Sequence, residues 1–565
     1  MAIRKGRVFL IFLLLVVVAL IVVGQLGQRV PEKTVLRVTL DQQVEEEDWP
    51  DFQGKVWEGD VIVFRHLLEA LDRAKTDDRI VGVSVEIDSP GMGVAKIQEV
   101  RRKLAELGKA GKFCAAYLDS DMINNRTYYL ASACPEVYIA PTGTLALTSL
   151  MGHTMFVRGT LDKLHIYPDM HSIAEYKTAK NLYTEKKFTA AHREMVVSLV
   201  TDWQRQIVED IAAGRKLEAA EVEKLVQGGP YLAEEAVEHK LVDKILYPDE
   251  YRDLLKKKAA ADELKTLGWK PYRQRSTAPS GPAVAIVYGT GIIVTGESGY
   301  VPFSGRFLGA DTVAEALRQA REDDSVKAIV FRVDSPGGSA LASEIIRRQV
   351  VLAKKDKPVV VSMSDVAGSG GYWIAMSADK IVADPGTITG SIGVVFGKMN
   401  VKGLYELLGM TNDYVALGPN ATIFYPFENF TPQQREQVMK FMQMIYGNFL
   451  QGVSEGRGIT TEEVDRIGKG RVYLGSQAKE LKLVDELGGL DTAIAVAKKL
   501  AKIPADQEVS FKIYPREKTG LEQFQEWLQV RTAAQPPLKV LLDPARLAVE
   551  QGPVQVRMPF RLEPR

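Results

Sequence analysis

IVGVSVEIDSP (residues 80–90) and VKAIVFRVDSP (residues 326–336) decide the fold of this chain, because they are two copies of one motif. Each copy is an apolar run that ends in Asp-Ser-Pro, which is typical of a buried strand leading into a turn. A helical pattern follows both copies, over residues 95–112 in the first and 339–355 in the second. The chain therefore contains a long internal repeat, and this repeat fixes the architecture before any other motif is interpreted.

The two copies stay in register well beyond this motif. Tyr128 corresponds to Tyr372, Pro141 to Pro385, and the run KLVD occurs at residues 240–243 and again at 482–485. Strands that alternate with helices over such a length predict an α/β fold with parallel sheets covered by helices.

The repeat also predicts the domain boundaries. We expect repeat domains at residues 33–270 and 283–505, joined by a polar linker at 271–282 that is rich in proline and serine. A tail at 506–565 contains one amphipathic stretch, at 521–530, to which we assign no chemistry.

The amino terminus predicts a membrane anchor. Arg4, Lys5 and Arg7 precede an apolar run at residues 8–26, close to the roughly 20 residues that span a bilayer. Because positive charge stays in the cytoplasm, residues 1–7 are expected there and the rest of the chain on the other side. A cleaved signal peptide is the alternative, but the apolar run is long for one and no Ala-x-Ala-like cleavage site follows.

Composition excludes several functions. Lysines and arginines (72) equal aspartates and glutamates (72), which removes any global electrostatic case for binding nucleic acid. Cys114 and Cys134 are too few for a disulfide scaffold and lack the spacing of a zinc site, so no metal is expected. Both lie in segments that resemble core, which favours buried thiols over a single bridge, although an exported protein could form one.

A candidate nucleophile lies in the second copy. Ser369 follows a predicted strand and precedes a helix-like segment, with glycines at 368, 370 and 371 that would admit a substrate carbonyl. A serine at a helix start is more often an N-cap. The first copy, however, has Asn125 at this position, and asparagine would cap equally well. The difference between the copies therefore favours a chemical role for Ser369.

The first copy supplies a candidate base. A serine hydroxyl needs an adjacent base, and none of the six histidines has a recognisable triad order with Ser369. Lys177 is replaced by Pro419 in the second copy, so one copy keeps the lysine and the other keeps the serine. A lone loop lysine is usually solvated, but desolvation lowers the pKa of a lysine enough for it to accept a proton. The sequence thus predicts one active site built from both copies.

The chain resembles the long, tandem-repeat form of the signal peptide peptidase A family, also called protease IV, over nearly its full length. The resemblance is carried by the apolar run at 8–26, the DSPGG turn at 334–338, Ser369 within GSGGYW, Lys177 within EYKTA, and TGSIG at 389–393. It implies a fold like that of the Clp protease and crotonase superfamily, preceded by one transmembrane helix.

The resemblance also implies the chemistry of the site. It describes a serine endopeptidase with a Ser369/Lys177 dyad, an acyl-enzyme intermediate and no cofactor. Ser391 would orient the lysine, and the backbone N–H groups of Gly338 and Gly370 would form the oxyanion hole. Lys180 and Tyr183 differ from the usual run of the family, which bears on substrate fit.

Location and partners follow from the same resemblance. It implies a homotetramer that lies on the outer face of the bacterial cytoplasmic membrane. This tetramer is expected to degrade remnant signal peptides and other apolar peptides. Two alternatives remain at this point. One is a crotonase-like enzyme that acts on acyl-thioesters without a serine nucleophile, and the other is a non-catalytic membrane scaffold.

Overall fold

The computed structural model describes residues 30–48, 60–275, 280–301, 304–516, 522 and 554–557. The anchor predicted at 8–26 lies outside these residues. Within them, no helix combines the length and the apolar character needed to cross a bilayer. We call the described part up to residue 275 the first half and the part from residue 280 the second half.

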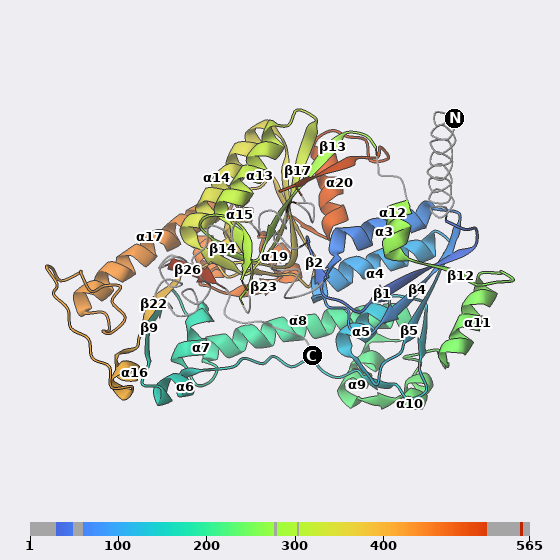
Figure 1. The fold of residues 1–565 in the computed structure, drawn as a ribbon, viewed down its shortest axis with the longest axis horizontal. Coiled ribbons are helices and arrows are strands. Elements are labelled where there is room, and N and C mark those ends of the chain that lie inside the picture. The colour runs from blue at the N-terminus through green and yellow to red at the C-terminus, as the bar shows by residue number, and fades with distance from the viewer. Residues whose placement is uncertain are drawn as a thin grey trace, which may run out of the picture.

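The first half is built on a six-stranded parallel sheet with the order β11-β7-β5-β4-β1-β12. Its central strands are buried apolar runs, as parallel strands covered on both faces must be. Helices α3 and α4 cover one face, and α11 covers the other (Figure 1). The elements are β1 (Thr34–Leu40), α3 (Phe64–Thr76), β4 (Ile80–Ile87), α4 (Val94–Lys109), β5 (Phe113–Leu118), β7 (Glu136–Ile139), β11 (Lys244–Ile245), α11 (Pro248–Lys258) and β12 (Lys265–Gly268).

The second half repeats this plan with an eight-stranded sheet, in which β23-β21-β19-β17-β13-β25 form one path and β20 and β24 branch from it. All of its pairs are parallel except that between β21 and β23. The strands are β13 (Ala283–Thr290), β17 (Val326–Ser335), β19 (Val359–Gly368), β20 (Lys380–Ala383), β21 (Ile388–Gly390), β23 (Val472–Leu474), β24 (Glu486–Leu487) and β25 (Ser510–Tyr514). Helices α13 (Ala310–Glu322), α14 (Ala340–Asp356) and α20 (Leu490–Leu500) pack on this sheet. The predicted α/β class with parallel sheets is confirmed.

The repeat is visible in matching contacts. Tyr128 Oη donates to the carbonyl of Leu241 at 2.6 Å, and Tyr372 Oη donates to that of Leu483 at 2.9 Å. Each half also has a 26-residue helix, α8 (Ala190–Arg215) or α17 (Pro432–Arg457), that ends in a left-handed residue. The last arginine of each helix pairs with the aspartate of its KLVD run. The halves are therefore copies in structure as well as in sequence.

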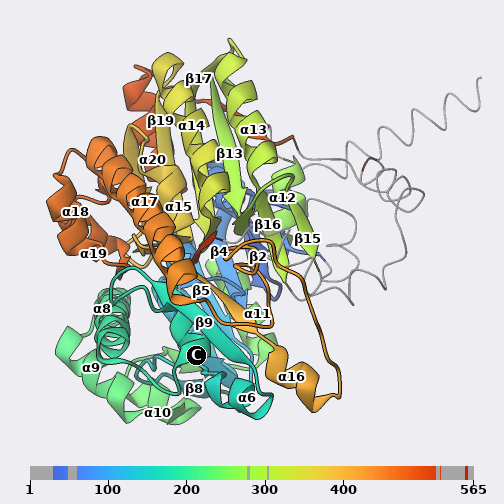
Figure 2. The ribbon, with the colours of Figure 1, turned by 90° about the vertical axis from the view of Figure 1, so that its left-hand side faces the viewer.

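The halves pack tightly against each other. Figure 2 shows α8 and α9 (Ala219–Gly228) of the first half below α17 and α19 (Gly475–Glu480) of the second. Between them, β9 (Tyr167–Ser172) pairs antiparallel with β22 (Val395–Asn400). A buried ion cluster joins the halves too, since Arg332 of β17 bonds Glu46 and Glu99 of the first half.

Three segments that reach into the predicted linker or lie in the predicted tail have regular structure. Helix α12 (Trp269–Arg275) runs into the predicted linker and packs on α3. Strand β25 lies in the predicted tail, yet it extends the second sheet beside β13. Strand β26 (Val554–Arg557), also in the tail, pairs with β22 and with β18 (Gly337–Ser339). Regular structure of the second half therefore continues past residue 505.

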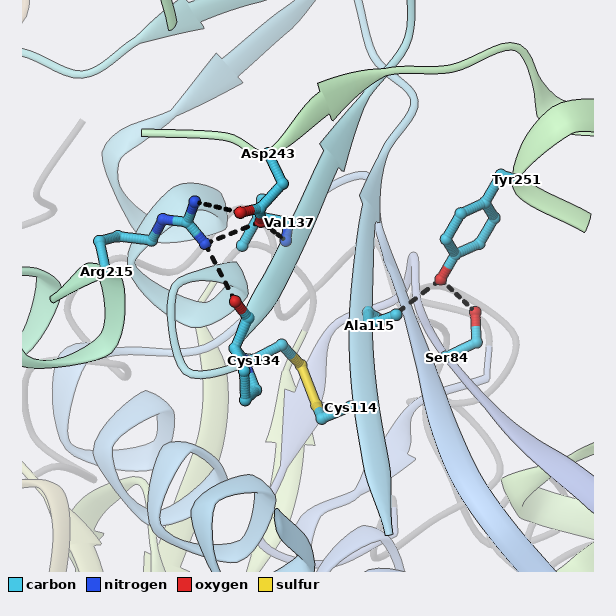
Figure 3. The surroundings of a disulfide bond; sticks show 9 residues. Ser84, Cys114, Ala115, Cys134, Val137, Arg215, Asp243 and Tyr251 are labelled. Atoms are coloured by element: carbon cyan, nitrogen blue, oxygen red, sulfur yellow. Dashed lines mark hydrogen bonds and ion pairs between the residues drawn. A yellow bond between two sulfur atoms is a disulfide. The ribbon is translucent and has the colours of Figure 1, made fainter. Parts of the chain in front are cut away.

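The two cysteines are bonded to each other, which corrects the expectation of buried thiols. Cys114 lies on β5, and Cys134 follows α5 (Asn125–Ala131), so the fold brings their Cα atoms within 5.1 Å, a normal spacing for a disulfide (Figure 3). Next to Cys134, Arg215 pairs with Asp243, whose carboxylate also accepts from the backbone of β7. The pairing depends on where α5 ends in space, which the sequence does not reveal.

Candidate active site

Ser369 stands at a sharp turn between β19 and α15 (Gly370–Ala375). Its backbone has φ 59° and ψ −115°, a conformation that a residue with a side chain adopts only at an energetic cost. Strain of this kind concentrates at functional sites. The Ser369 side chain makes no capping hydrogen bond to α15, so the N-cap role that competed with the chemical one does not apply.

Lys177 reaches Ser369 from the other half. It follows β9, and the antiparallel pairing of β9 with β22 carries the lysine to the second half. Its Nζ lies 2.6 Å from Ser369 Oγ and 2.9 Å from both Oγ and the carbonyl oxygen of Ser391. These three side chains are almost fully buried, with Lys177 1% exposed. The structure thus brings together the predicted serine, the predicted lysine and the residue expected to orient the lysine.

The electrostatic setting of Lys177 favours the neutral amine. Burial lowers the pKa of Lys177 well below its usual range. Its hydrogen-bond partners are hydroxyl and carbonyl oxygens rather than carboxylates. A neutral amine has a lone pair and can accept the proton of a serine hydroxyl, which a protonated lysine cannot.

The two glycines predicted for the oxyanion hole lie side by side. A Cβ at Gly370 would fall 3.0 Å from the backbone nitrogen of Gly338, and a Cβ at Gly338 would fall 2.8 Å from the backbone nitrogen of Ile293. Both positions therefore require glycine for steric reasons. Because Gly370 directly follows Ser369, the backbone around both glycines borders the space that a carbonyl bound to Ser369 would fill.

Lys96 supports the turn that carries Gly338, and sequence reasoning missed it. Its Nζ lies 2.5 Å from Asp334, the first residue of the turn, and 3.1 Å from Asp365. Asp334 also accepts from the backbone N–H of Val366 at 3.1 Å. Burial raises the pKa of Asp334 to about 6 despite the lysine. The signal in the sequence was only a lysine at a helix position that the amphipathic pattern assigns to the core.

The second missed feature is a turn at residues 468–471, which we call the lysine clasp. The Lys469 carbonyl accepts from the N–H of Tyr176 at 3.1 Å, and the Arg471 carbonyl accepts from the N–H of Ser391 at 2.7 Å. Gly470 packs directly on Lys177, since a Cβ there would lie 2.6 Å from the Lys177 Cα. No sequence signal marked this turn, because its partners come from distant segments.

The remaining predicted positions lie nearby without taking part in these contacts. Lys180 belongs to the 3₁₀ turn Thr178–Lys180, and Tyr183 lies in α7 (Asn181–Thr184) with its ring partly exposed. Asn125, the counterpart of Ser369, hydrogen-bonds through its amide to the backbone of Thr148. The first half therefore uses this position for structure.

Comparison with known proteins agrees with the repeat. The sequence profile of peptidase family S49 matches residues 108–262 and 352–504, one match in each half. The chain is 32% identical to "Serine protease SPPA, chloroplastic" of Arabidopsis thaliana, covering 94% of this chain and 78% of that protein. It is 30% identical to "Protease 4" of Salmonella typhi, covering 77% and 72%. It is also 33% identical to "Putative signal peptide peptidase SppA" of Enterococcus faecium, covering 39% and 63%. A strained buried serine, a desolvated amine in contact with it and these matches lead to one conclusion: the chain belongs to peptidase family S49 and is a serine protease.

Proposed function

We propose that this protein is a membrane-anchored endopeptidase that uses Ser369 as nucleophile and Lys177 as general base to degrade apolar peptides outside the cytoplasm. The single observation that carries the proposal is the 2.6 Å separation of Lys177 Nζ from Ser369 Oγ in a buried site. This separation is within the range over which a base removes a proton.

The mechanism is acyl transfer in two steps. Ser369 Oγ attacks the peptide carbonyl carbon while Lys177 Nζ accepts the hydroxyl proton, and the N–H groups of Gly338 and Gly370 donate to the resulting oxyanion. Lys177 then protonates the leaving amine, which departs and leaves an acyl-enzyme. In the second step Lys177 removes a proton from water, which attacks the acyl carbonyl; the bond to Ser369 Oγ then breaks, and Lys177 returns the proton to that oxygen. Each donor to the oxyanion contributes about 3 to 4 kcal/mol in comparable sites.

Substrate and location extend the proposal. The apolar run at 8–26 is proposed to anchor the chain in the bacterial cytoplasmic membrane, with both halves on the extracytoplasmic side. Remnant signal peptides are apolar and concentrate at the bilayer, so an anchored protease meets them at a raised effective concentration. The name of the Enterococcus faecium relative supports this substrate class. We also propose that each subunit has a Clp-like fold and that the protein is a homo-oligomer, specifically a tetramer.

The test is a comparison of the full chain with Ser369→Ala and Lys177→Ala on apolar peptides, together with a phosphonate probe. We expect both variants to lose activity by at least about 10³-fold, because removing either residue of a catalytic pair also removes the function of the other. Mass spectrometry should locate the phosphonate on Ser369. Labelling of another residue, or turnover by either variant at the wild-type rate, would disprove the dyad. A wild type that neither reacts with the probe nor hydrolyses peptides faster than the two variants would favour the thioester or scaffold alternatives.

A further inference from the structure

Lys96 is a second buried lysine at the boundary of the two halves, and its charge state is opposite to that of Lys177. It lies in the first turn of α4, is 4% exposed and contacts three carboxylates: Asp334 at 2.5 Å, Asp365 at 3.1 Å and Glu46 at 3.5 Å. Burial on its own lowers the pKa of Lys96, but the neighbouring carboxylates raise it well above its usual range. Lys96 is therefore charged, so it can hold carboxylates but cannot accept a proton.

The two aspartates that Lys96 holds stand at the two arms of the active site. Asp334 begins the turn that leads to Gly338, and Asp365 lies on β19, the strand that leads to the nucleophile. The Asp334 carboxylate also accepts from the N–H of Val366 at 3.1 Å, which joins the two arms directly. A cation in contact with both carboxylates therefore ties the oxyanion turn to the strand of the nucleophile.

The start of α4 is capped by the second half. In the equivalent helix α14, the side chain of Ser339 accepts from the N–H of Ala342 at 3.3 Å. The first half has Gly93 in place of this serine, and Asp365 instead accepts from the N–H groups of Gly93 and Lys96, both at 3.1 Å. A Cβ on Gly93 would collide with the Asp365 carboxylate. The start of α4 is therefore shaped to receive this carboxylate.

The repeat shows that the lysine, unlike the aspartates, belongs to one copy only. The Asp-Ser-Pro alignment places Ala342 where the first half has Lys96. Both aspartates, in contrast, have counterparts in the first half, Asp88 and Asp121. The aspartates are thus part of the repeated fold. The lysine, like each member of the dyad, occurs in a single copy, and it faces the copy of the turn that carries out the chemistry.

Packing leaves the two carboxylates room to move. A cavity of about 250 Å³ borders them, and its lining includes Gly93, Lys96, Asp334 and Asp365. Two carboxylates close together repel each other, and a cation between them turns this repulsion into attraction. The contacts with Lys96 therefore provide a restraint that packing does not provide on this side of the turn.

We infer that Lys96 is a positioning residue for the protease reaction, because it draws Asp334 and Asp365 together and so sets the oxyanion turn against the nucleophile. It acts through these carboxylates and has no contact with the reacting atoms. The inference rests on the proposed roles of Gly338 and Ser369. It adds a second residue of the first half on which the geometry of the site depends.

Lys96→Met tests the inference, and Lys103→Met is its matched control. Lys103 lies about 10 Å further along α4, is 6% exposed and also pairs with one aspartate of each half, Asp72 and Asp491. We expect Lys96→Met to lower kcat by about 10²-fold with KM unchanged, because displacement of a catalytic group by about 1 Å costs about that much. Lys103→Met should keep the wild-type kcat, and Lys96→Arg should recover part of the loss.

A transition-state analogue separates positioning from a merely structural role. A peptide aldehyde forms an adduct with Ser369 whose oxygen occupies the oxyanion hole, so its affinity should fall by the same factor as kcat. The value of kcat is taken per site titrated with the phosphonate probe, so that unfolded molecules do not count. If Lys96→Met matches Lys103→Met in kcat, or loses kcat but keeps its aldehyde affinity, Lys96 does not position the turn.

Gly93→Ala is an independent test that leaves every charge in place, and it decides the question if Lys96→Met does not fold. Gly93 has φ −79°, an ordinary value for alanine, so the substitution acts through its collision with Asp365. We expect kcat and aldehyde affinity to fall together, and wild-type values of both would overturn the inference. A wild type that neither hydrolyses apolar peptides nor binds the aldehyde would instead refute the proposed function, and the inference with it.

Discussion

Gly470→Ala should disable the enzyme although the nucleophile, the base and the oxyanion donors are all left unsubstituted. The new Cβ would lie 2.6 Å from the Lys177 Cα, whereas non-bonded carbon atoms rest about 3.5 Å or more apart. The lysine clasp and the lysine backbone must therefore separate by about 1 Å. Displacement of a catalytic group by about 1 Å costs on the order of 10²-fold in rate, and we expect that loss in kcat.

A matched control isolates this contact. Gly470 has φ 80°, so alanine there also carries a left-handed backbone penalty of about 1–2 kcal/mol. Gly458 has φ 65°, and no atom lies within 4 Å of the position that a Cβ would take there, so Gly458→Ala carries the same penalty without the contact. Gly458→Ala should lose the thermal stability that corresponds to the backbone penalty alone, Gly470→Ala should lose at least as much, and only Gly470→Ala should lose activity.

The pH dependence gives an independent measure of the same variant. Burial alone lowers the pKa of Lys177, so kcat/KM of the wild type should rise with pH along a limb below the ordinary lysine range. Loosening the clasp admits water, which moves the lysine pKa back up, and the limb should shift to higher pH. If Gly470→Ala and Gly458→Ala have the same kcat and the same pH limb, the clasp does not position Lys177.

Three further outcomes are expected from the structure. Lys177→Met should inactivate the enzyme yet raise its melting temperature at pH 7, because burial that lowers the pKa of the amine destabilises the folded state by up to about 1.4 kcal/mol per unit of lowered pKa. Between the lowered pKa and the ordinary one the folded state binds fewer protons than the unfolded state, so wild-type stability should rise with pH across that window and the variant should lose this slope. Arg332→Ala should cost about 3–5 kcal/mol in urea unfolding, because it removes the buried guanidinium that pairs with the carboxylates of both Glu46 and Glu99. Reduction of the Cys114–Cys134 bridge, which closes a loop with a sequence separation of 20, should lower stability by about 3 kcal/mol, and a chain with both cysteines replaced by alanine should not respond to reductant.

Sequence reasoning succeeded where the signal is local or repeated. The helix predicted at residues 339–355 follows from the apolar periodicity alone, and α14 (Ala340–Asp356) lies within one residue of the predicted bounds. Ser369 and Lys177 were found because each is missing from the other copy. The clasp around Gly470 and the Lys96–Asp334 contact were not predicted, because each joins segments that lie far apart in the chain. In addition, Gly470 and Lys96 are not unusual residue types among their neighbours in the sequence.

The division of the dyad between two halves also has a physical consequence. A lysine acts as a base at moderate pH only when its amine is shielded from water. The first half alone cannot bury Lys177, because the atoms around its Nζ belong to Ser369 and Ser391 of the other half. The docking of the halves is therefore what lowers the lysine pKa. The buried contacts of Arg332 with Glu46 and Glu99, and of Lys96 with Asp334, hold the halves together elsewhere in the same interface. Weakening either contact should consequently admit water to the site and raise the Lys177 pKa before the fold itself is lost.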